Sequence, residues 1–252
     1  MVKKRIIPAL LLKSGGMVKG KQFSQFRDVG NPVTAARVYQ AQKVDELIFL
    51  DIEPNEQSQK RVKEIIREVA SECFMPLCVG GGISSLDGIK GFLDVGADKV
   101  SINTHAFLNP RLVQEGAEQF GDQCIVVSVD YRMDPDGSRR VWIESVKRAT
   151  GKDAMEHVER VVALGAGELL ITCIDREGMM QGYDLDFLKE VTQRVGVPVI
   201  ASGGAGKLDD FSLAFTQAGV SAVSAGSIFH FTDQSPIKAR YYLTVAGIGV
   251  RV

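Results

Sequence analysis

Short apolar runs recur along the chain, and each is separated from the next by a longer stretch with helical spacing. The runs are nearly continuous in apolar residues, which is typical of parallel strands that are covered on both faces. The pattern predicts strands at residues 5–12, 46–52, 76–79, 98–102, 124–130, 168–173, 197–201 and 220–225.

The intervening stretches predict helices at residues 33–43, 56–73, 86–95, 111–120, 153–164, 184–195, 208–218 and 236–245. Asn31-Pro32 and Asn109-Pro110 are predicted start signals, each with an asparagine cap and a proline in the first turn. Gly165 and Gly196 are predicted helix stops. Strands and helices that alternate in this number predict an α/β fold, a (β/α)8 TIM barrel, as a single domain over residues 1–252. A doubly wound sheet is the alternative, but it usually carries one phosphate loop near its N-terminus.

The chain contains an internal repeat. The strand, glycine turn, helix and strand of residues 76–103 recur as residues 198–227, half a chain away. Aligned without a gap, Gly81-Gly82 falls on Gly203-Gly204, and with one inserted residue Asn103-Thr104 meets Gly226-Ser227. The repeat predicts a barrel with two related halves.

Composition excludes several classes of function. The formal net charge is −1, so no basic surface indicates a nucleic-acid partner. No apolar run approaches the roughly 20 residues that span a membrane, and the basic and apolar N-terminus is interpreted as a first strand rather than a signal peptide. The histidines lack zinc spacing, so neither a metal nor an organic cofactor is expected. The four cysteines are interpreted as core thiols of a cytoplasmic protein: Cys73, Cys78, Cys124 and Cys173.

Glycine turns follow the third, seventh and eighth predicted strands. Glycine lets backbone N–H groups approach an anion, and a helix N-terminus favours negative charge. A single glycine turn is explained as well by a tight chain reversal. Two symmetric sets, each with small polar partners, favour two phosphate sites and an elongated substrate with a phosphate at each end. The predicted phosphate-binding residues are Gly81, Gly82, Asn103, Thr104, Gly203, Gly204, Gly226 and Ser227.

Asp130 ends the fifth predicted strand, where its carboxylate suits general acid/base chemistry at the barrel mouth, although a structural cap is the alternative. The corresponding position of the other half holds Leu11. The longest predicted loops, residues 13–30 and 131–152, also emerge at the mouth. Lys19 in the first of these loops is predicted to close over an anionic substrate, or else to be a solvated loop lysine.

Charged residues stand at the starts of four predicted strands: Arg5, Glu46, Lys99 and Glu168. The starts of barrel strands meet at the bottom of the barrel, where alternating charges are typical of a stabilising ring of ion pairs. From physical chemistry alone, that is the preferred interpretation of this set.

Several motifs resemble one family along essentially the whole chain: KRII, VKG, RDVGNP, DELIFLDI, VGGGI, GADKVSIN, ELLITCIDREG, GYD, IASGGAGK and GSIFHF. They are similar to the HisF family, the cyclase subunits of imidazole glycerol phosphate synthase. In that family the barrel receives ammonia from a separate glutaminase subunit docked on its bottom. At the top, the family closes an imidazole ring and releases an aminoimidazole carboxamide ribonucleotide.

The resemblance implies roles for individual residues. It assigns the charged bottom set to an ammonia gate, in place of the purely stabilising ring, and it implies a glutaminase partner. It makes Lys19 a mobile-loop lysine and Asp130 one of two catalytic carboxylates. It implies one phosphate site at Gly82, Asn103 and Thr104, and another at Gly178, Gly204, Gly226 and Ser227.

The chain departs from the family pattern at Leu11, where the second catalytic aspartate is expected, at Ser14, and at Glu177 within Asp175-Arg176-Glu177-Gly178. Leucine cannot transfer a proton. The segment RIIPALLLKSGGMVK resembles a paralogous branch that works with a glutaminase and a sugar amidotransferase to form an amidine on a surface-polysaccharide sugar. That branch is the preferred functional prediction. The alternatives are the histidine-pathway cyclase itself and a silent scaffold that activates a glutaminase.

Overall fold

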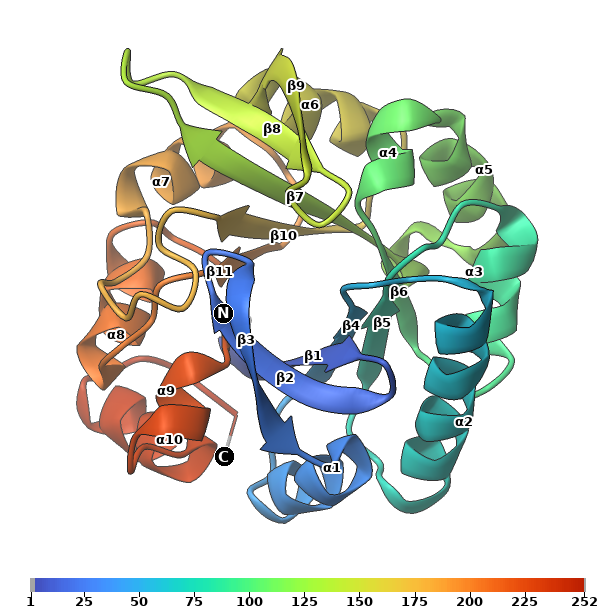
Figure 1. Cartoon of the computed structure of the whole chain (residues 1–252). Helices are drawn as coiled ribbons and strands as arrows, with labels where there is room; N and C mark the ends of the chain where they lie inside the picture. Colours follow the sequence, from blue (N-terminus) through green and yellow to red (C-terminus); the bar gives the residue numbers. More distant parts are fainter. Residues whose placement is uncertain (1–2, 252) are drawn as a thin grey trace.

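The strands close into a ring with helices around the outside, as the view along the barrel shows (Figure 1). The computed structural model describes residues 3–251, so residues 1, 2 and 252 of the predicted domain lie outside the described part. No helix among the described residues is long and apolar enough to cross a membrane.

The barrel strands confirm the predicted runs and order. They are β1 (Arg5–Lys13), β4 (Leu47–Asp51), β5 (Leu77–Gly80), β6 (Lys99–Ile102), β7 (Ile125–Met133), β10 (Glu168–Cys173), β11 (Val199–Ser202) and β12 (Ala222–Ala225). Each pairs with its neighbours in parallel, and both β1–β12 and β7–β10 pair, so no edge strand remains in the ring. This closure confirms the (β/α)8 barrel and excludes the doubly wound sheet, which has two edges.

The helices between the strands also match the prediction. They are α1 (Pro32–Ala41), α2 (Glu56–Glu72), α3 (Leu86–Leu93), α5 (Arg111–Phe120), α6 (Ala154–Ala163), α7 (Leu185–Arg194), α8 (Leu208–Thr216) and α10 (Pro236–Val245). The Asn31 side chain caps α1 by accepting a 3.0 Å hydrogen bond from the Thr34 amide. Gly165 follows α6 with a left-handed φ of 99°, as a helix stop requires.

Two predicted helix signals are wrong. The Asn109 side chain does not cap α5, because Pro110 occupies the cap position there and no side-chain hydrogen bond is made. The glycine stop expected at Gly196 is not used, because the preceding residue, Val195, already leaves α7 in an extended conformation (φ −116°, ψ 149°). Both helices still start and end within one or two residues of the predicted positions.

The two predicted long loops are β-hairpins. The first holds β2 (Gly16–Lys21) and β3 (Ser24–Gly30), and the second holds β8 (Arg139–Ile143) and β9 (Arg148–Asp153). Strands β1 and β7 extend beyond the ring and pair antiparallel with β2 and β8. The loop prediction was wrong because β3 and β9 are mostly exposed and lack the apolar runs of the barrel strands. Short segments α4 (Thr104–Leu108), α9 (Ser227–Phe231) and η1 (Asp122–Cys124) complete the chain.

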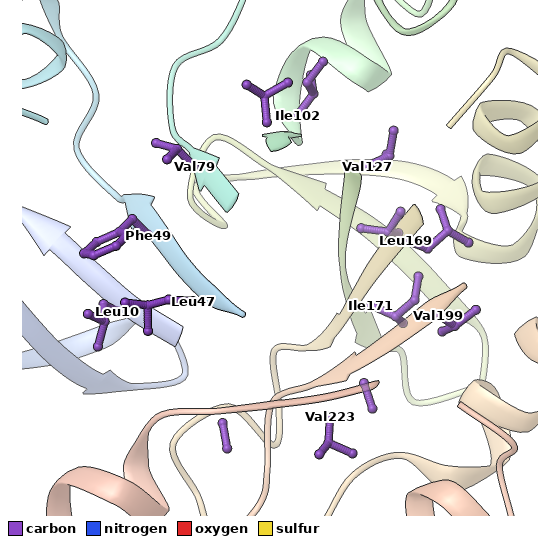
Figure 2. Close-up of a cluster of buried hydrophobic side chains, with 14 of the residues drawn as sticks. Leu10, Leu47, Phe49, Val79, Ile102, Val127, Leu169, Ile171, Val199 and Val223 are labelled. Atoms are coloured by element: carbon purple, nitrogen blue, oxygen red, sulfur yellow. The ribbon is translucent and has the colours of Figure 1, made fainter. Parts of the chain in front are cut away.

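Successive strand residues face opposite sides of the ring, so the strands build two apolar layers. The outer layer lies between strands and helices, and Figure 2 shows members such as Phe49, Val79 and Ile102 on neighbouring strands. The inner layer is a separate cluster with one residue from each of seven strands: Ile7, Ile48, Cys78, Val126, Leu170, Ile200 and Ala222. Cys73 and Cys173 are likewise buried free thiols, whereas Cys124 is partly exposed.

Candidate functional site

A cavity of about 640 Å³ opens at the C-terminal ends of the barrel strands, and we call it the mouth cavity. Every predicted catalytic and phosphate-binding residue lines it. These residues are Leu11, Lys19, Gly81, Gly82, Asn103, Thr104, Asp130, Gly178, Gly203, Gly204, Gly226 and Ser227. The barrel therefore brings together positions that the sequence separates by up to half its length.

Asp130 is a buried carboxyl group on the wall of the mouth cavity. It lies within β7 rather than at its end, because β7 continues into the second hairpin, and its side chain accepts a 3.0 Å hydrogen bond from the Asn103 amide. Burial raises the pKa of Asp130 from 3.8 to about 7, while hydrogen bonds from Thr172 and Asn103 act in the opposite direction. A carboxyl group with this pKa both donates and accepts protons near neutral pH.

The glycine turns on both sides of the mouth cavity adopt backbone conformations that require glycine. Gly81 and Gly204 have φ of 120° and 121°, which residues with a side chain rarely adopt. A Cβ on Gly81 would lie 2.5 Å from the Asp51 oxygen, and one on Gly204 would lie 2.2 Å from the Gly182 oxygen. Glycine therefore lets each turn pack closely against a neighbouring loop, and both turns line the mouth cavity, on opposite halves of the barrel.

Lys19 lies in β2 and is only 4% exposed, so it is neither a solvated lysine nor part of an irregular loop. Its ammonium group is paired with the Glu177 carboxylate, which follows β10. A Cβ on Gly226 would lie 3.1 Å from Lys19 Cε, so the lysine stem packs against the C-terminal glycine site. The hairpin thus carries one positive charge into that side of the mouth cavity.

The hairpin tips fasten to the loops beside them. In the first hairpin, the Gln22 amide donates a 2.8 Å hydrogen bond to the Glu177 oxygen. In the second, the Glu144 amide donates to Thr104 Oγ1 at 3.0 Å, and Ser145 Oγ donates to the Ile52 oxygen at 2.9 Å. Each hairpin therefore reaches from its own half of the barrel to a loop or helix start of the other half.

Leu11 presents an apolar side chain at the edge of the mouth cavity. It lies on β1, opposite Leu50 on β4 and Val18 on β2. Ala9 and Leu50 pack against the inner apolar layer just below it. This side of the mouth cavity has no carboxylate at the position that corresponds to Asp130 in the other half.

The charged bottom set forms a closed ring, which we call the basal ring (Arg5, Glu46, Lys99 and Glu168). Arg5 contacts Glu46 at 2.9 Å and also pairs with Glu168. Lys99 contacts Glu46 at 2.9 Å and Glu168 at 2.7 Å. Each cation therefore bridges both glutamates, at the N-terminal ends of the strands.

Burial and pairing oppose each other in the basal ring. Burial raises the pKa of Glu46, which is 2% exposed, although the Lys99 charge acts to lower it. Burial acts to lower the pKa of Lys99, but its two glutamate partners outweigh that effect, and the net pKa is raised. The charges therefore remain in the barrel only because each one has partners of opposite sign.

The basal ring, the inner apolar layer and the mouth cavity follow one another along the strands. Arg5, Ile7 and Ala9 alternate on β1, so they face the barrel interior at three successive levels. Glu168, Leu170 and Thr172 do the same on β10. A small neutral molecule that passed the basal ring would cross an apolar layer before it reached Asp130.

Sequence reasoning missed several polar residues of the barrel interior. Ser101 on β6 and Ser224 on β12 line the mouth cavity, and their buried hydroxyl oxygens lack a partner among the described residues. Thr172 faces Asp130 across the β7–β10 pairing. The available signal was the two-residue alternation of strands, which places Ser101 on the same face as Lys99 and Asn103.

Comparisons with known proteins agree with this geometry. The family model described as a histidine biosynthesis protein matches residues 5–235. The chain is 45% identical over 252 residues to the imidazole glycerol phosphate synthase subunit HisF of Geobacillus kaustophilus, with 100% of both chains covered. The HisF subunit of Geobacillus thermodenitrificans matches with the same identity and coverage. Neither match singles out the paralogous sugar branch. The chain therefore belongs to the HisF family of histidine-biosynthesis barrels.

Proposed function

We propose that the chain is the ammonia-using synthase subunit of a glutamine-dependent enzyme of the imidazole glycerol phosphate synthase type. Ammonia enters at the basal ring, crosses the inner apolar layer and reacts at the mouth cavity beside Asp130. The reaction that the relatives' names support best is formation of imidazole glycerol phosphate, a cyclisation with release of a second product.

The observation that carries this proposal is the arrangement of three zones along one barrel axis. The basal ring closes the lower end by ion pairs, and the side chains of the next level are apolar. An apolar layer is crossed far more easily by neutral ammonia than by ammonium, because an ion loses its hydration there. Asp130, with a pKa of about 7, lies at the upper end, where proton transfer is needed.

The substrate is an elongated molecule with a phosphate at each end. Two glycine turns lie on opposite halves of the mouth cavity, and small polar residues line the cavity beside each, Asn103 and Thr104 on one side and Ser227 on the other. Lys19 adds a positive charge on the second side, next to Gly226. Bare backbone and a nearby cation are the usual means by which proteins hold a phosphate.

The partner is a glutaminase subunit that docks at the bottom of the barrel, where the basal ring receives its ammonia. In the resting arrangement all four ring side chains are paired, so the lower entrance is closed. Displacing one side chain opens a passage at the cost of leaving a buried charge unpaired. Docking that supplies a substitute partner for that charge lowers the cost.

The test is growth of a histidine-requiring bacterial strain that lacks its own cyclase subunit. If the chain is the histidine-pathway cyclase, its expression together with a glutaminase subunit restores growth without histidine. Expression is verified by immunoblot, and an Asp130→Asn variant serves as the inactive control. Failure to restore growth at good expression excludes the histidine cyclase.

A second candidate function is favoured by Leu11. With an apolar residue in place of the second carboxylate, the same ammonia route serves amidine formation on a sugar, together with a separate sugar amidotransferase. Purified chain, glutaminase and amidotransferase are then incubated with a nucleotide-activated N-acetyl sugar and glutamine. Mass spectrometry distinguishes the two functions, because only the second adds an acetamidino group to the sugar.

A further inference from the structure

Glu177 is a mouth carboxylate with spare hydrogen-bonding capacity. It lies in the turn after β10, and its side chain is 14% exposed. One carboxylate oxygen, Oε1, accepts from the Lys19 ammonium group. The other, Oε2, is buried and has no hydrogen-bond partner among residues 3–251. A buried carboxylate oxygen normally has a donor, so this oxygen is available to one that a substrate brings.

The backbone holds Glu177 firmly at the wall of the mouth cavity. Its amide donates hydrogen bonds of 3.0 Å to the Cys173 oxygen and 3.2 Å to the Ile174 oxygen, and its own oxygen accepts from the Gln22 amide at 2.8 Å. The turn is thus anchored both to β10 and to the first hairpin. Such anchoring fixes the position of the carboxylate without help from a ligand.

Asp130 lies on β7, and Glu177 lies in the turn that follows the adjacent strand, β10. Strands β10 and β7 pair in parallel with Thr172 opposite Asp130, and Glu177 follows only a few residues later on the same wall. Burial is the largest cause of the raised pKa of Asp130, and the negative charge of Glu177 raises it further. Two carboxyl groups in different surroundings are the usual arrangement for an acid and a base that act together.

We propose that Glu177 supplies the second proton-transferring carboxyl group of the mouth cavity, in place of the carboxylate that Leu11 lacks. This inference rests on the proposed ammonia-using function, and it holds for either product. It assigns the base to Glu177, which is ion-paired with Lys19, and the acid to Asp130.

The roles follow from the addition of ammonia to a substrate carbonyl carbon. The nitrogen lone pair forms the C–N bond while the carbonyl π pair moves to oxygen. Oxygen takes the Asp130 proton, and nitrogen gives its excess proton to Glu177, which yields a neutral carbinolamine. When water leaves, Glu177 returns its proton to the departing hydroxyl and the nitrogen gives one to Asp130. Both carboxyl groups are then back in their starting states.

The test compares Glu177→Gln with wild type, with ammonium salt replacing the glutaminase. Asp175→Asn is the matched control, because Asp175 lies in the same turn, is more exposed and keeps an acceptor for the Met133 amide. We expect Glu177→Gln to lower kcat about 10²–10⁴-fold with little change in KM. The double variant Glu177→Gln, Leu11→Asp regains activity, because the carboxylate returns at the other position.

A titration of the Asp130 carboxyl carbon by NMR provides a readout that needs no substrate. In Glu177→Gln, loss of the Glu177 charge is expected to lower the pH midpoint of the Asp130 titration. In Asp175→Asn, the midpoint is expected to stay at its wild-type value. The proposal is overturned if the midpoint does not move, or if Glu177→Gln keeps the wild-type rate and pH profile. If the wild-type chain makes no product from ammonia, but the Asp130 midpoint is lower in Glu177→Gln than in wild type, the proposed function is contradicted. The electrostatic pairing of the two carboxyl groups then remains supported.

Discussion

The side-chain amide of Asn103 donates a 3.0 Å hydrogen bond to the Asp130 carboxylate and a 3.1 Å hydrogen bond to the Ser128 oxygen. Asn103 also stands immediately before α4, at one of the two predicted phosphate sites. The residue that opens this site therefore also positions the carboxyl group that we propose transfers protons. Because the amide donates to the ionised form, it opposes the effect of burial on the pKa of Asp130.

Removal of this hydrogen bond is expected to raise the pKa of Asp130 above its value of about 7. Asn103→Leu removes the donor while keeping the volume of the side chain. The alkaline limb of the ammonia-driven pH–rate profile then moves to higher pH, and the NMR titration of Asp130 moves with it. Asn109→Leu, at the other end of α4, is the control. If the midpoint of the Asp130 titration stays in place or falls in Asn103→Leu, Asn103 does not stabilise the ionised Asp130 carboxylate.

Burial of Asp130 makes folding stability depend on pH. The folded-state pKa of about 7 exceeds the ordinary value of 3.8, so between these values the folded chain holds a proton that the unfolded chain has lost. Stability therefore falls as pH rises through this window. Relative to wild type, Asp130→Asn gains on the order of 3 kcal/mol in unfolding free energy between pH 4 and pH 8.

Urea unfolding at the two pH values measures this gain, with Asp186→Asn, an exposed aspartate of α7, as the control for a change of charge. An equal pH dependence in wild type and Asp130→Asn would show that Asp130 is ionised at all these pH values. The buried acid would then have an ordinary pKa.

The basal ring is expected to lose stability when one cation is removed. Lys99→Met leaves Glu46 and Glu168 sharing Arg5 alone, and breaking a buried pair in this way typically costs about 3–5 kcal/mol. Lys90→Met breaks an exposed pair with Asp94 at the end of α3 and costs much less than the loss of Lys99. Denaturant unfolding measures both values.

Adding Glu46→Gln to Lys99→Met removes the uncompensated charge and recovers part of the lost stability. A loss in Lys99→Met that is no greater than in Lys90→Met contradicts the closed arrangement of the basal ring. Equal stability of the single and double variants contradicts the electrostatic origin of the loss.

Leu11→Asp places a carboxylate at the position that corresponds to Asp130 in the other half of the barrel. Because Glu177 already supplies the second carboxyl group, we expect Leu11→Asp to change the rate less than about tenfold in the wild-type background, but to restore about 10²–10⁴-fold in the Glu177→Gln background. Leu11→Asn, which has similar size and polarity but no titratable group, is the control. If Leu11→Asp and Leu11→Asn give equal rates in the Glu177→Gln background, position 11 takes no part in proton transfer.

Much of this site follows from strand order alone. A barrel is predicted from eight apolar runs, and strand starts and ends then collect at opposite openings. The strand order therefore predicts Arg5 and Lys99 at the bottom, and Asp130 and the glycine turns at the mouth. The structure adds that Lys99 bridges Glu46 and Glu168 at 2.9 and 2.7 Å.

The pairing of Lys19 with Glu177 was not predictable from the sequence. It depends on how the first hairpin folds back over the turn after β10, and the polar sequence of β3 carries no strand pattern. The conformation at the tip of the second hairpin was not predictable from the sequence either. Glu144, Ser145 and Val146 all have left-handed φ values near 50–60°, although none is glycine. Tertiary contacts impose that conformation against local preference.

Transfer of nitrogen from glutamine to product through the barrel is measured most directly with a stable isotope. The chain and a glutaminase subunit are given glutamine labelled with nitrogen-15 in the side-chain amide, the mouth substrate and an excess of unlabelled ammonium. We predict that the product of the wild-type barrel retains the label, and that Lys99→Met, which opens the basal ring, allows unlabelled ammonium to dilute it. Label that appears only as free ammonia, with no label in any product, contradicts the account and indicates a scaffold that activates the glutaminase.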